Sequence, residues 1–266
     1  MESVNSILSS KSFEFIRDKA DEAEKQQKAM ALNRVKSRQV RKTDSVVESN
    51  ALARAEYRMT LTEKRLLNLA IAKLDSTLAS EEQLQDIAVT VEEYIKIYDA
   101  SNHNAYTEIA QAAKRLMNRQ LTVHHKDESY TIYNLLVDST YRKKEGTVFM
   151  TINPRLTSDL INLRGQFTQY MLENVRHFKL YSSARLYEIM KSVESQRFLE
   201  VSIEDFKARL LADPNKYKKF CDLRRWVIEP ALSEINTLSD IRVKYETIKR
   251  SRKIARLRFT ITKNKH

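Results

Sequence analysis

The side chains with the most evident chemistry are cations near the carboxyl end of the chain. From Asn215 to His266 there are 15 basic and 5 acidic residues, so this segment holds +10 of a formal net charge of +12. Arginine can make forked hydrogen bonds to guanine, and lysine can pair with phosphates. The cluster therefore predicts a polyanionic partner such as double-stranded DNA, with a solvated cationic surface as the alternative. Its candidate contact residues are Lys216, Lys218, Lys219, Arg224, Arg225, Lys249, Arg250, Arg252 and Lys253.

The other reactive side chains do not form a recognisable catalytic or metal-binding pattern. Glycine occurs only at Gly146 and Gly165, which excludes a glycine-rich phosphate loop. Cys221 is the single cysteine, which excludes an intramolecular disulfide and fits a reducing compartment. His124 and His125 are adjacent on an expected strand, so their side chains point to opposite faces. We therefore expect no catalytic residue, no metal, no cofactor and no enzymatic activity.

The helix that would present these cations is predicted to run from about Lys216 to Asn236. Lys218, Lys219 and Arg225 point away from its apolar stripe. Arg224 lies nearer the edge of that stripe. The stripe itself consists of Phe220, Leu223, Val227, Ala231 and Ile235.

Two residues of this helix have unusual positions. Pro230 lies inside the helix, where it removes one hydrogen bond and should kink the axis. Trp226 lies close to that bend. We expect its side chain to fill the core rather than to stack on bases.

A β-hairpin is predicted to follow the helix. Alternating apolar residues indicate strands at Ile241–Ile248 and Ile254–Ile261, joined by a turn at Lys249–Lys253 that holds four positive charges. A basic hairpin tip beside a helix in the major groove can reach a neighbouring phosphate strand or the minor groove. Helix and tip together predict that DNA affinity falls steeply with rising salt.

A similar set of elements is predicted earlier in the chain. The spacing of apolar residues predicts helices over Thr60–Leu74 and from Thr90 to about Ser101, with a strand at Ile87–Val89 between them. Both threonines have a glutamate three residues later, the spacing of a capping box. A third helix, capped by Asn102, would bury Ala105, Ile109, Ala112 and Leu116. It would turn outward Thr107, Gln111, Lys114 and Asn118, of which the first three are candidate DNA contacts.

Three strands are predicted after this helix, at Leu121–His125, Tyr130–Val137 and Thr147–Ile152. The first two would form the hairpin of this unit, with residues 126–129 in a turn of little net charge. We therefore expect this unit to contribute less to DNA affinity. The apolar hairpin residues would form either a protein interface or part of the unit's own core; they are Ile132, Leu135, Leu136 and Val137.

The two sets of elements resemble each other in sequence. Val201–Phe206 matches Val89–Tyr94 position by position, and Arg185–Tyr187 echoes Arg65–Leu67. Helix, strand, helix, helix, strand, turn, strand is the order of a winged helix. We predict an α+β fold with two tandem winged-helix domains related by a pseudo-repeat, at residues 46–160 and 161–266. A long helix from about Gln166 to Val193 would join them.

Residues 1–45 are predicted to form a flexible or loosely helical N-terminal arm. The segment is polar and ends in several basic residues, so it would either lie along phosphates or act as a solubilising tail. No stretch of about 18 uncharged apolar residues occurs in the chain. We therefore expect a cytoplasmic protein that makes no membrane contact.

Three motifs resemble the iteron-binding plasmid replication initiator proteins of the two-winged-helix type, over about Val46 to Lys263. Ser251 departs from the family pattern, in which glycine often precedes the arginine of the turn. The first motif comprises Asn50, Ala51, Leu52, Ala53, Tyr57, Leu61, Glu63, Lys64, Arg65, Leu66 and Leu67. The second comprises Tyr181, Ser182, Ala184, Arg185, Leu186, Tyr187 and Glu188, and the third Glu234, Ile235, Asn236, Ile241, Lys249, Arg250, Arg252 and Lys253.

The resemblance implies a protein that binds repeated origin sites as a monomer and its own promoter as a dimer. It also implies opening of adjacent AT-rich DNA with the host replication initiator, and loading of the host replicative helicase. The DNA-reading helix of the family would map onto Arg224 and Arg225, and its wing onto Arg250 and Arg252. Two alternatives stay open: a transcriptional repressor only, or a DNA-nicking enzyme that uses Tyr217, Tyr245 or another tyrosine.

Overall fold

The computed structural model describes residues 19, 22, 38–74, 84–125, 127–161, 163, 165–211, 213 and 215–264. The chain divides into two compact units, Met1–Arg38 and Gln39–His266, and the following description concerns the second. Most of the predicted N-terminal arm lies outside the described residues. Near its end, Val40 is buried and its amide donates to a carboxylate oxygen of Glu93 at 3.2 Å.

The helices of the first winged-helix unit follow the predicted order. α3 (Leu61–Ala72) begins after Thr60 and α4 (Val91–Tyr98) after Thr90, and both have the predicted capping box. β3 (Ile87–Thr90) lies between them. α5 (Asn102–Leu116) is capped by Ser101 rather than by Asn102, because the serine hydroxyl accepts the amide of His103.

Six strands of this unit form two separate sheets. β4 (Gln120–His124) pairs with β2 (Glu56–Tyr57) and with β5 (Tyr130–Asn134). β7 (Thr147–Ile152) pairs with β3 and with β6 (Leu136–Arg142). The predicted strand Tyr130–Val137 is therefore two strands. It is interrupted at Leu135, whose amide donates to the carbonyl of Arg119 and whose carbonyl accepts from Asn153.

Strand order shows which hairpin is the wing of the first unit. In the second unit, β9 (Phe198–Ser202) pairs with β11 (Lys253–Lys263), which pairs with β10 (Ile241–Arg250). In the first unit, β3, β7 and β6 pair in the same order, so its wing is the β6–β7 hairpin. The prediction that residues 126–129 form this wing is wrong. β4 and β5 are an additional hairpin that belongs to another sheet.

The segment that joins the two winged-helix units begins with a strand, not with the predicted long helix. β8 (Phe167–Met171) pairs antiparallel with β1 (Ser45–Ser49). Alternate residues of β8 are buried, which is the period of a strand. The helix of this segment, α7 (Tyr181–Lys191), starts only after the short turn η3 (Leu172–Asn174). The domain boundary at residue 160 stays a prediction.

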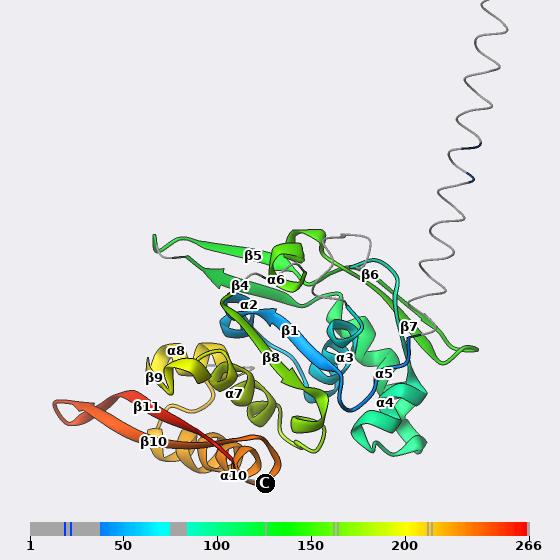
Figure 1. Cartoon of the computed structure of the whole chain (residues 1–266). Helices are drawn as coiled ribbons and strands as arrows, with labels where there is room; N and C mark the ends of the chain where they lie inside the picture. The colour runs from blue at the N-terminus through cyan, green and yellow to red at the C-terminus, as the bar shows by residue number, and fades with distance from the viewer. Residues whose placement is uncertain are drawn as a thin grey trace, which may run out of the picture. The chain divides into compact units, whose positions relative to one another are not determined.

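The second unit repeats the order of the first, as predicted. After α7 and β9 come α8 (Ile203–Leu210), α9 (Phe220–Leu223), the π turn η5 (Arg224–Ile228) and α10 (Glu229–Leu238). Figure 1 shows the β10–β11 hairpin extending beyond α8 and β9. The remaining short elements are α2 (Asn50–Arg54), η2 (Pro154–Leu156), α6 (Thr157–Leu160) and η4 (Glu194–Gln196).

A buried ionic cluster connects the two winged-helix units. Lys64 of α3 and Arg185 of α7 both pair with the carboxylate of Glu188, and all three side chains are at most 1% exposed. The Tyr57 hydroxyl donates to the same carboxylate at 2.6 Å. Arg185 also donates to the carbonyls of Ala53 and Arg209, at 2.7 and 3.2 Å. One guanidinium therefore ties α2 of the first unit to α8 of the second.

Candidate nucleic-acid interface

Three of the predicted contact lysines lie on a loop rather than on a helix. The helical segment starts at Phe220, and Lys216, Lys218 and Lys219 precede it. Asp213 holds this loop in a turn, because its carboxylate accepts the amide of Asn215 and its carbonyl accepts the amide of Lys216. All three lysines are exposed, but the predicted helix boundary at Lys216 is wrong.

The π turn shows how the helical segment accommodates Pro230. The amide of Glu229 donates to the carbonyl of Arg224, five residues back. In a regular α-helix, the Pro230 ring would clash with the carbonyl of Trp226, and no amide would bond to it. The wider turn removes this conflict, so the helix continues into α10.

Three consecutive side chains of η5 face the solvent. Arg224 and Arg225 are exposed, and Trp226 is 59% exposed. The guanidinium carbon of Arg225 lies 4.9 Å from the centre of the Trp226 ring, a cation–π contact. The expectation that Trp226 fills the core is wrong, because Val227 and Ile228 supply the buried side chains of this turn.

The β10–β11 hairpin ends in a turn that is tighter than predicted. Arg250 pairs with Lys253, which leaves only Ser251 and Arg252 at the tip. Ser251 has φ of 59°, a left-handed conformation that glycine adopts more easily. Side chains 249–253 are all exposed, so the four predicted cations of the hairpin face the solvent.

A groove of about 610 Å³ brings part of the predicted site together. Lys218 lines it from the loop, and Arg252 and Lys253 line it from the hairpin. Apolar side chains of α8, α9 and β11 also line the groove. Arg224, Arg225, Lys249 and Arg250 lie outside the lining, so the structure places them on the surface around this groove rather than within it.

Within the described ranges, an acidic side chain neutralises two cations in the middle of β11 but none at the hairpin tip. Glu200 of β9 pairs with Arg256 and Arg258 of β11, each at 2.8 Å. Hydrogen bonds from Arg258, and then the positive charges of both arginines, lower the pKa of Glu200. Among the described residues, none of the candidate cations between Lys216 and Lys253 takes part in a salt bridge.

The side chain of Tyr245, on β10, is held by a hydrogen bond to α10. Its hydroxyl donates to Glu229 at 3.0 Å. Burial, followed by this contact with Glu229, raises the pKa of Tyr245 to about 12. A lowered pKa favours a nucleophilic tyrosine, and Tyr245 has the opposite shift.

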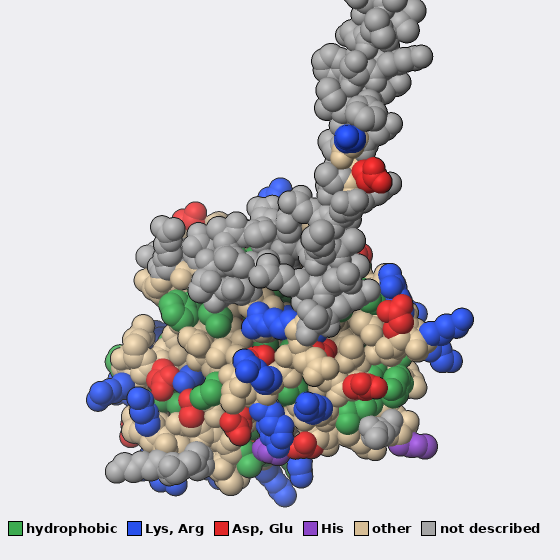
Figure 2. All heavy atoms as spheres, turned by 45° about the vertical axis from the view of Figure 1, so that its right-hand side comes forward, with side chains coloured by type: hydrophobic (Ala, Val, Ile, Leu, Met, Phe, Trp, Pro, Cys, Tyr) green, Lys and Arg blue, Asp and Glu red, His purple; other side chains and the backbone are tan. Residues whose placement is uncertain are grey.

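In the first unit, α5 has the predicted orientation. Thr107, Gln111 and Lys114 are exposed, whereas Ala105 and Ile109 are buried. Figure 2 brings the α4–α5 side forward and shows Lys and Arg side chains dispersed among Asp, Glu and other polar side chains. The role of these residues in DNA contact stays a prediction.

The wing of the first unit is more basic than predicted. Its turn contains Lys143 and Lys144, both exposed, whereas Arg142 pairs with Glu145 at 3.3 Å. The turn closes at Gly146, which has φ of 56°. A Cβ there would lie 2.9 Å from the Tyr106 ring, so the wing packs against α5. Sequence reasoning missed this wing, although a basic triplet before a glycine between two strands could have revealed it.

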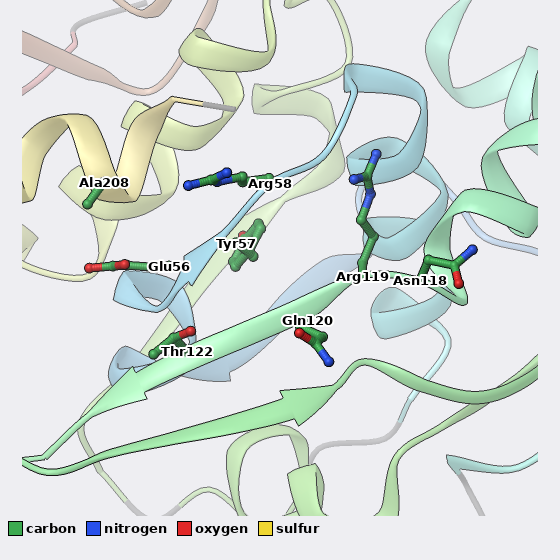
Figure 3. Close-up of a pocket in the computed structure, with 8 residues that line it drawn as sticks. All are labelled: Glu56, Tyr57, Arg58, Asn118, Arg119, Gln120, Thr122 and Ala208. Atoms are coloured by element: carbon green, nitrogen blue, oxygen red, sulfur yellow. The ribbon is translucent and has the colours of Figure 1, made fainter. Parts of the chain in front are cut away.

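A second hollow of about 310 Å³ lies between β2, the start of β4 and α8 (Figure 3). Arg119 lines it and is held by Glu63 at 2.8 Å, while Glu56 contacts His124 at 3.1 Å. Figure 3 shows Arg58 extending toward Ala208 of α8. The hollow therefore lies where the two winged-helix units meet.

Metal ligands, reactive thiols and membrane-spanning helices would indicate other chemistry in the part of the chain that the structure describes. No three His, Cys, Asp or Glu side chains there lie close enough to hold a metal ion. Cys221 is exposed at the start of α9. No described helix has the length and apolar character needed to cross a membrane.

Two family models match this chain in tandem. The model described as "Initiator Replication protein, WH1" matches residues 45–191, and "Initiator Rep protein, WH2" matches residues 202–261. Together they cover both of the winged-helix units seen in the fold.

Individual relatives are similar at moderate identity. A "Replication initiation protein" of Escherichia coli is 26% identical over 205 residues, which are 74% of this chain and 64% of that protein. An "Uncharacterized 27.6 kDa protein" of Escherichia coli is 24% identical over 75% of this chain and 88% of its own length. The chain thus spans about 64% of the length of the first of these relatives.

One solved structure has the same fold. It is described as the crystal structure of Pi initiator protein in complex with iteron DNA, and it is 20% identical to this chain. The match has a TM-score of 0.71 and covers 84% of this chain and 98% of that one. It confirms the predicted α+β fold with two tandem winged helices.

Proposed function

We propose a function that starts from one premise: this chain belongs to the Initiator Replication protein family, both of whose winged-helix modules it contains. The chain binds repeated sites in double-stranded DNA at a plasmid origin and initiates replication there. The surface of the second unit formed by loop 215–219, η5 and the β10–β11 tip is its main contact. The relative with a solved structure is described in complex with iteron DNA, which supports this proposal.

The observation that carries the proposal is the unneutralised charge of that surface. Lys218, Arg252 and Lys253 share one groove, and Arg224 and Arg225 are exposed beside it. An exposed guanidinium on a helical turn fits the edge of guanine, and the lysines fit phosphates. A basic hairpin beside a recognition helix is the arrangement with which winged helices bind duplex DNA.

Fluorescence anisotropy with a labelled duplex from the DNA flanking the gene tests this directly. We expect Arg224→Ala with Arg225→Ala to abolish the preference for the repeat over a scrambled duplex. The matched control, Arg155→Ala with Lys179→Ala, also removes two exposed charges but lies outside the proposed surface. Retained preference in the Arg224/Arg225 variant, with an intact circular dichroism spectrum, would contradict the proposal.

The chain would act on the origin without forming a covalent bond to DNA. Distorting a site of this size costs on the order of 1–6 kcal/mol, which phosphate contacts and two inserted helices can offset. The raised pKa of Tyr245 disfavours that tyrosine as a nucleophile. Permanganate footprinting should show unpaired thymines beside the repeats when the chain is bound. A covalent protein–DNA adduct with supercoiled DNA and magnesium would instead favour a nicking enzyme.

The host replication initiator and replicative helicase are the further partners in this proposal, and the cytoplasm is the compartment where they meet. A homodimer in equilibrium with the monomer would repress the chain's own promoter. Exposed apolar residues on two edge strands support a protein interface, because Ile132 of β5 and Val137 of β6 are 52% and 55% exposed. Leu135 and Leu136 belong to the core instead. Sedimentation of Ile132→Ser with Val137→Ser should show more monomer than the unmodified chain.

A further inference from the structure

The solvent-facing side of α5 is rich in amide side chains. Asn104, Gln111 and Asn118 are all exposed and recur every seven residues, so they lie along one stripe of the helix and the turn that follows it. Thr107 and Lys114 lie between them and are also exposed. This stripe offers hydrogen-bond donors and acceptors but only one positive charge.

The arginines near the end of α5 are paired with an acidic side chain. Nε of Arg115 and Nε of Arg119 both donate to the carboxylate of Glu63, which is fully buried. Burial alone would raise the pKa of Glu63, but the hydrogen bonds from Arg119 and Arg115 outweigh it and lower that pKa. Glu63 therefore stays ionised and neutralises both guanidiniums, whose side chains remain 41% and 29% exposed.

The corresponding surface of the second unit exposes cationic side chains rather than amides. η5 exposes Arg224 and Arg225 side by side, and no described acidic side chain pairs with either. The two winged-helix units thus have the same strand order but expose different side-chain groups at corresponding places: amides in the first and guanidiniums in the second.

These groups match different bases in the major groove. The amide of Asn or Gln can bond to N6 and N7 of adenine together, whereas arginine bonds to O6 and N7 of guanine. We propose that α5 reads adenines in one half of the repeat while η5 reads guanines in the other. This inference rests on the proposed function, because it assigns base preferences to the same two winged helices.

The β6–β7 wing supplies the charge that α5 lacks. Lys143 and Lys144 are exposed at its tip, and the close approach of Gly146 to the Tyr106 ring fixes the wing beside the first half of α5. Lysines there can pair with the phosphates that flank the groove without selecting a sequence. The amides of α5 are then left to distinguish the bases.

Single-atom changes in the DNA test the proposal. The repeat is first selected from random duplexes by the full chain, and each purine is then replaced in turn by its 7-deaza analogue, which lacks the N7 acceptor. We expect 7-deazaadenine to weaken binding roughly 5- to 150-fold at positions in one half and 7-deazaguanine to do so in the other.

Variants of the chain assign each half to its helix. Gln111→Ala should lose sensitivity to 7-deazaadenine at the adenine that Gln111 contacts and keep full sensitivity to 7-deazaguanine. Arg225→Ala should lose sensitivity at one guanine and keep it at the adenines. Arg155→Ala, on the surface outside both helices, should keep both sensitivities. If Gln111→Ala stays sensitive at every adenine, or if both halves respond to the same purine, the division of bases is overturned.

The same experiment separates this inference from the proposed function. If the unmodified chain selects no duplex over a scrambled one, the proposed function fails. If it selects a repeat but the 7-deaza pattern does not divide between the halves, only the inference fails.

Discussion

Glu188 lies at the centre of a cluster of charged side chains that are at most 1% exposed. Burial alone would raise its pKa, but the positive charges of Lys64 and Arg185 outweigh burial and hold it well below its ordinary value. Glu48, next to it, has the opposite shift. Burial and the negative charge of Glu188 raise the pKa of Glu48 well above its ordinary value. These shifts favour the ionised form of Glu188 and the protonated form of Glu48.

This difference gives a matched pair of isosteric variants. Glu188→Gln leaves two buried cations without a carboxylate, and we expect it to lower the free energy of unfolding by about 3–5 kcal/mol. Glu48→Gln replaces a neutral acid with a neutral amide, so we expect it to cause no loss of stability at pH 7. Urea denaturation followed by circular dichroism measures both. An equal loss in the two variants would contradict the assigned protonation states.

The dependence on pH follows from the same shifts. A group whose pKa is raised by folding contributes stability at low pH and loses it as pH rises through the folded pKa. Glu48 is such a group, so Glu48→Gln should gain stability relative to the unmodified chain as pH rises from about 4.3 toward the raised folded pKa of Glu48. Glu188 has a lowered pKa, and its contribution should instead be present above about pH 4.3 and be lost on acidification.

Trp226 is the only tryptophan in the chain, and it lies among the proposed DNA contacts. Because its ring is more than half exposed and next to Arg225, a duplex bound over η5 should shield it from water and quench its fluorescence. We expect the emission to change in proportion to bound repeat DNA. Trp226→Phe should remove the signal and show that Trp226 is its source. Unchanged emission at saturating DNA would place the duplex elsewhere.

Among the elements, the π turn has a specific cause in the sequence. Pro230 cannot donate a backbone hydrogen bond and would clash with the carbonyl of Trp226 in a regular α-helix. Pro230→Ala removes both constraints, so the helix can become regular and rotate Arg224 and Arg225 away from their present directions. We expect unchanged or higher thermal stability and a loss of about 1–3 kcal/mol in affinity for the repeat, the contribution of one forked base contact. An affinity equal to that of the unmodified chain would show that the π turn does not position these arginines.

Several elements could be predicted because their signals are local. The capping boxes at Thr60 and Thr90 and the apolar period of α5 act within a few residues, and the structure confirms them. The β1–β8 pair could not be predicted in the same way. Its strands are more than 100 residues apart, so only tertiary packing shows that Thr168 and Tyr170 follow a strand period rather than a helical one.

The candidate site was predicted unevenly for a related reason. Exposure of Arg225 and of the hairpin tip follows from the local apolar pattern, and the structure agrees. The choice between the β4–β5 and β6–β7 hairpins depends on which strand pairs with β3, which the sequence does not encode locally. The exposure of Trp226 was missed because an isolated tryptophan is usually read as a core residue.

Over the whole molecule, the two wings differ in the charge that surrounds them. The segment from residue 215 onward holds most of the net charge, and its wing tip has no described salt bridge. The first wing adds the exposed Lys143 and Lys144 in a turn where Arg142 and Glu145 pair with each other. If both wings contact phosphates, the salt dependence of binding should report the two contributions separately.

The slope of log affinity against log salt is negative. Each phosphate contact makes it steeper by about 0.9, because counterions are released from the DNA. We therefore expect Arg250→Ala with Arg252→Ala to make the slope shallower by about 1.8, and Lys143→Ala with Lys144→Ala to have a similar effect. In the combined variant the slope should become shallower by about 3.6, since the wings bind different phosphates. Arg155→Ala with Lys179→Ala removes the same charge and should leave the slope unchanged. Anisotropy titrations at four salt concentrations measure these slopes. A change after the second-wing substitutions alone would restrict phosphate binding to the second unit and leave α5 without its anchoring wing.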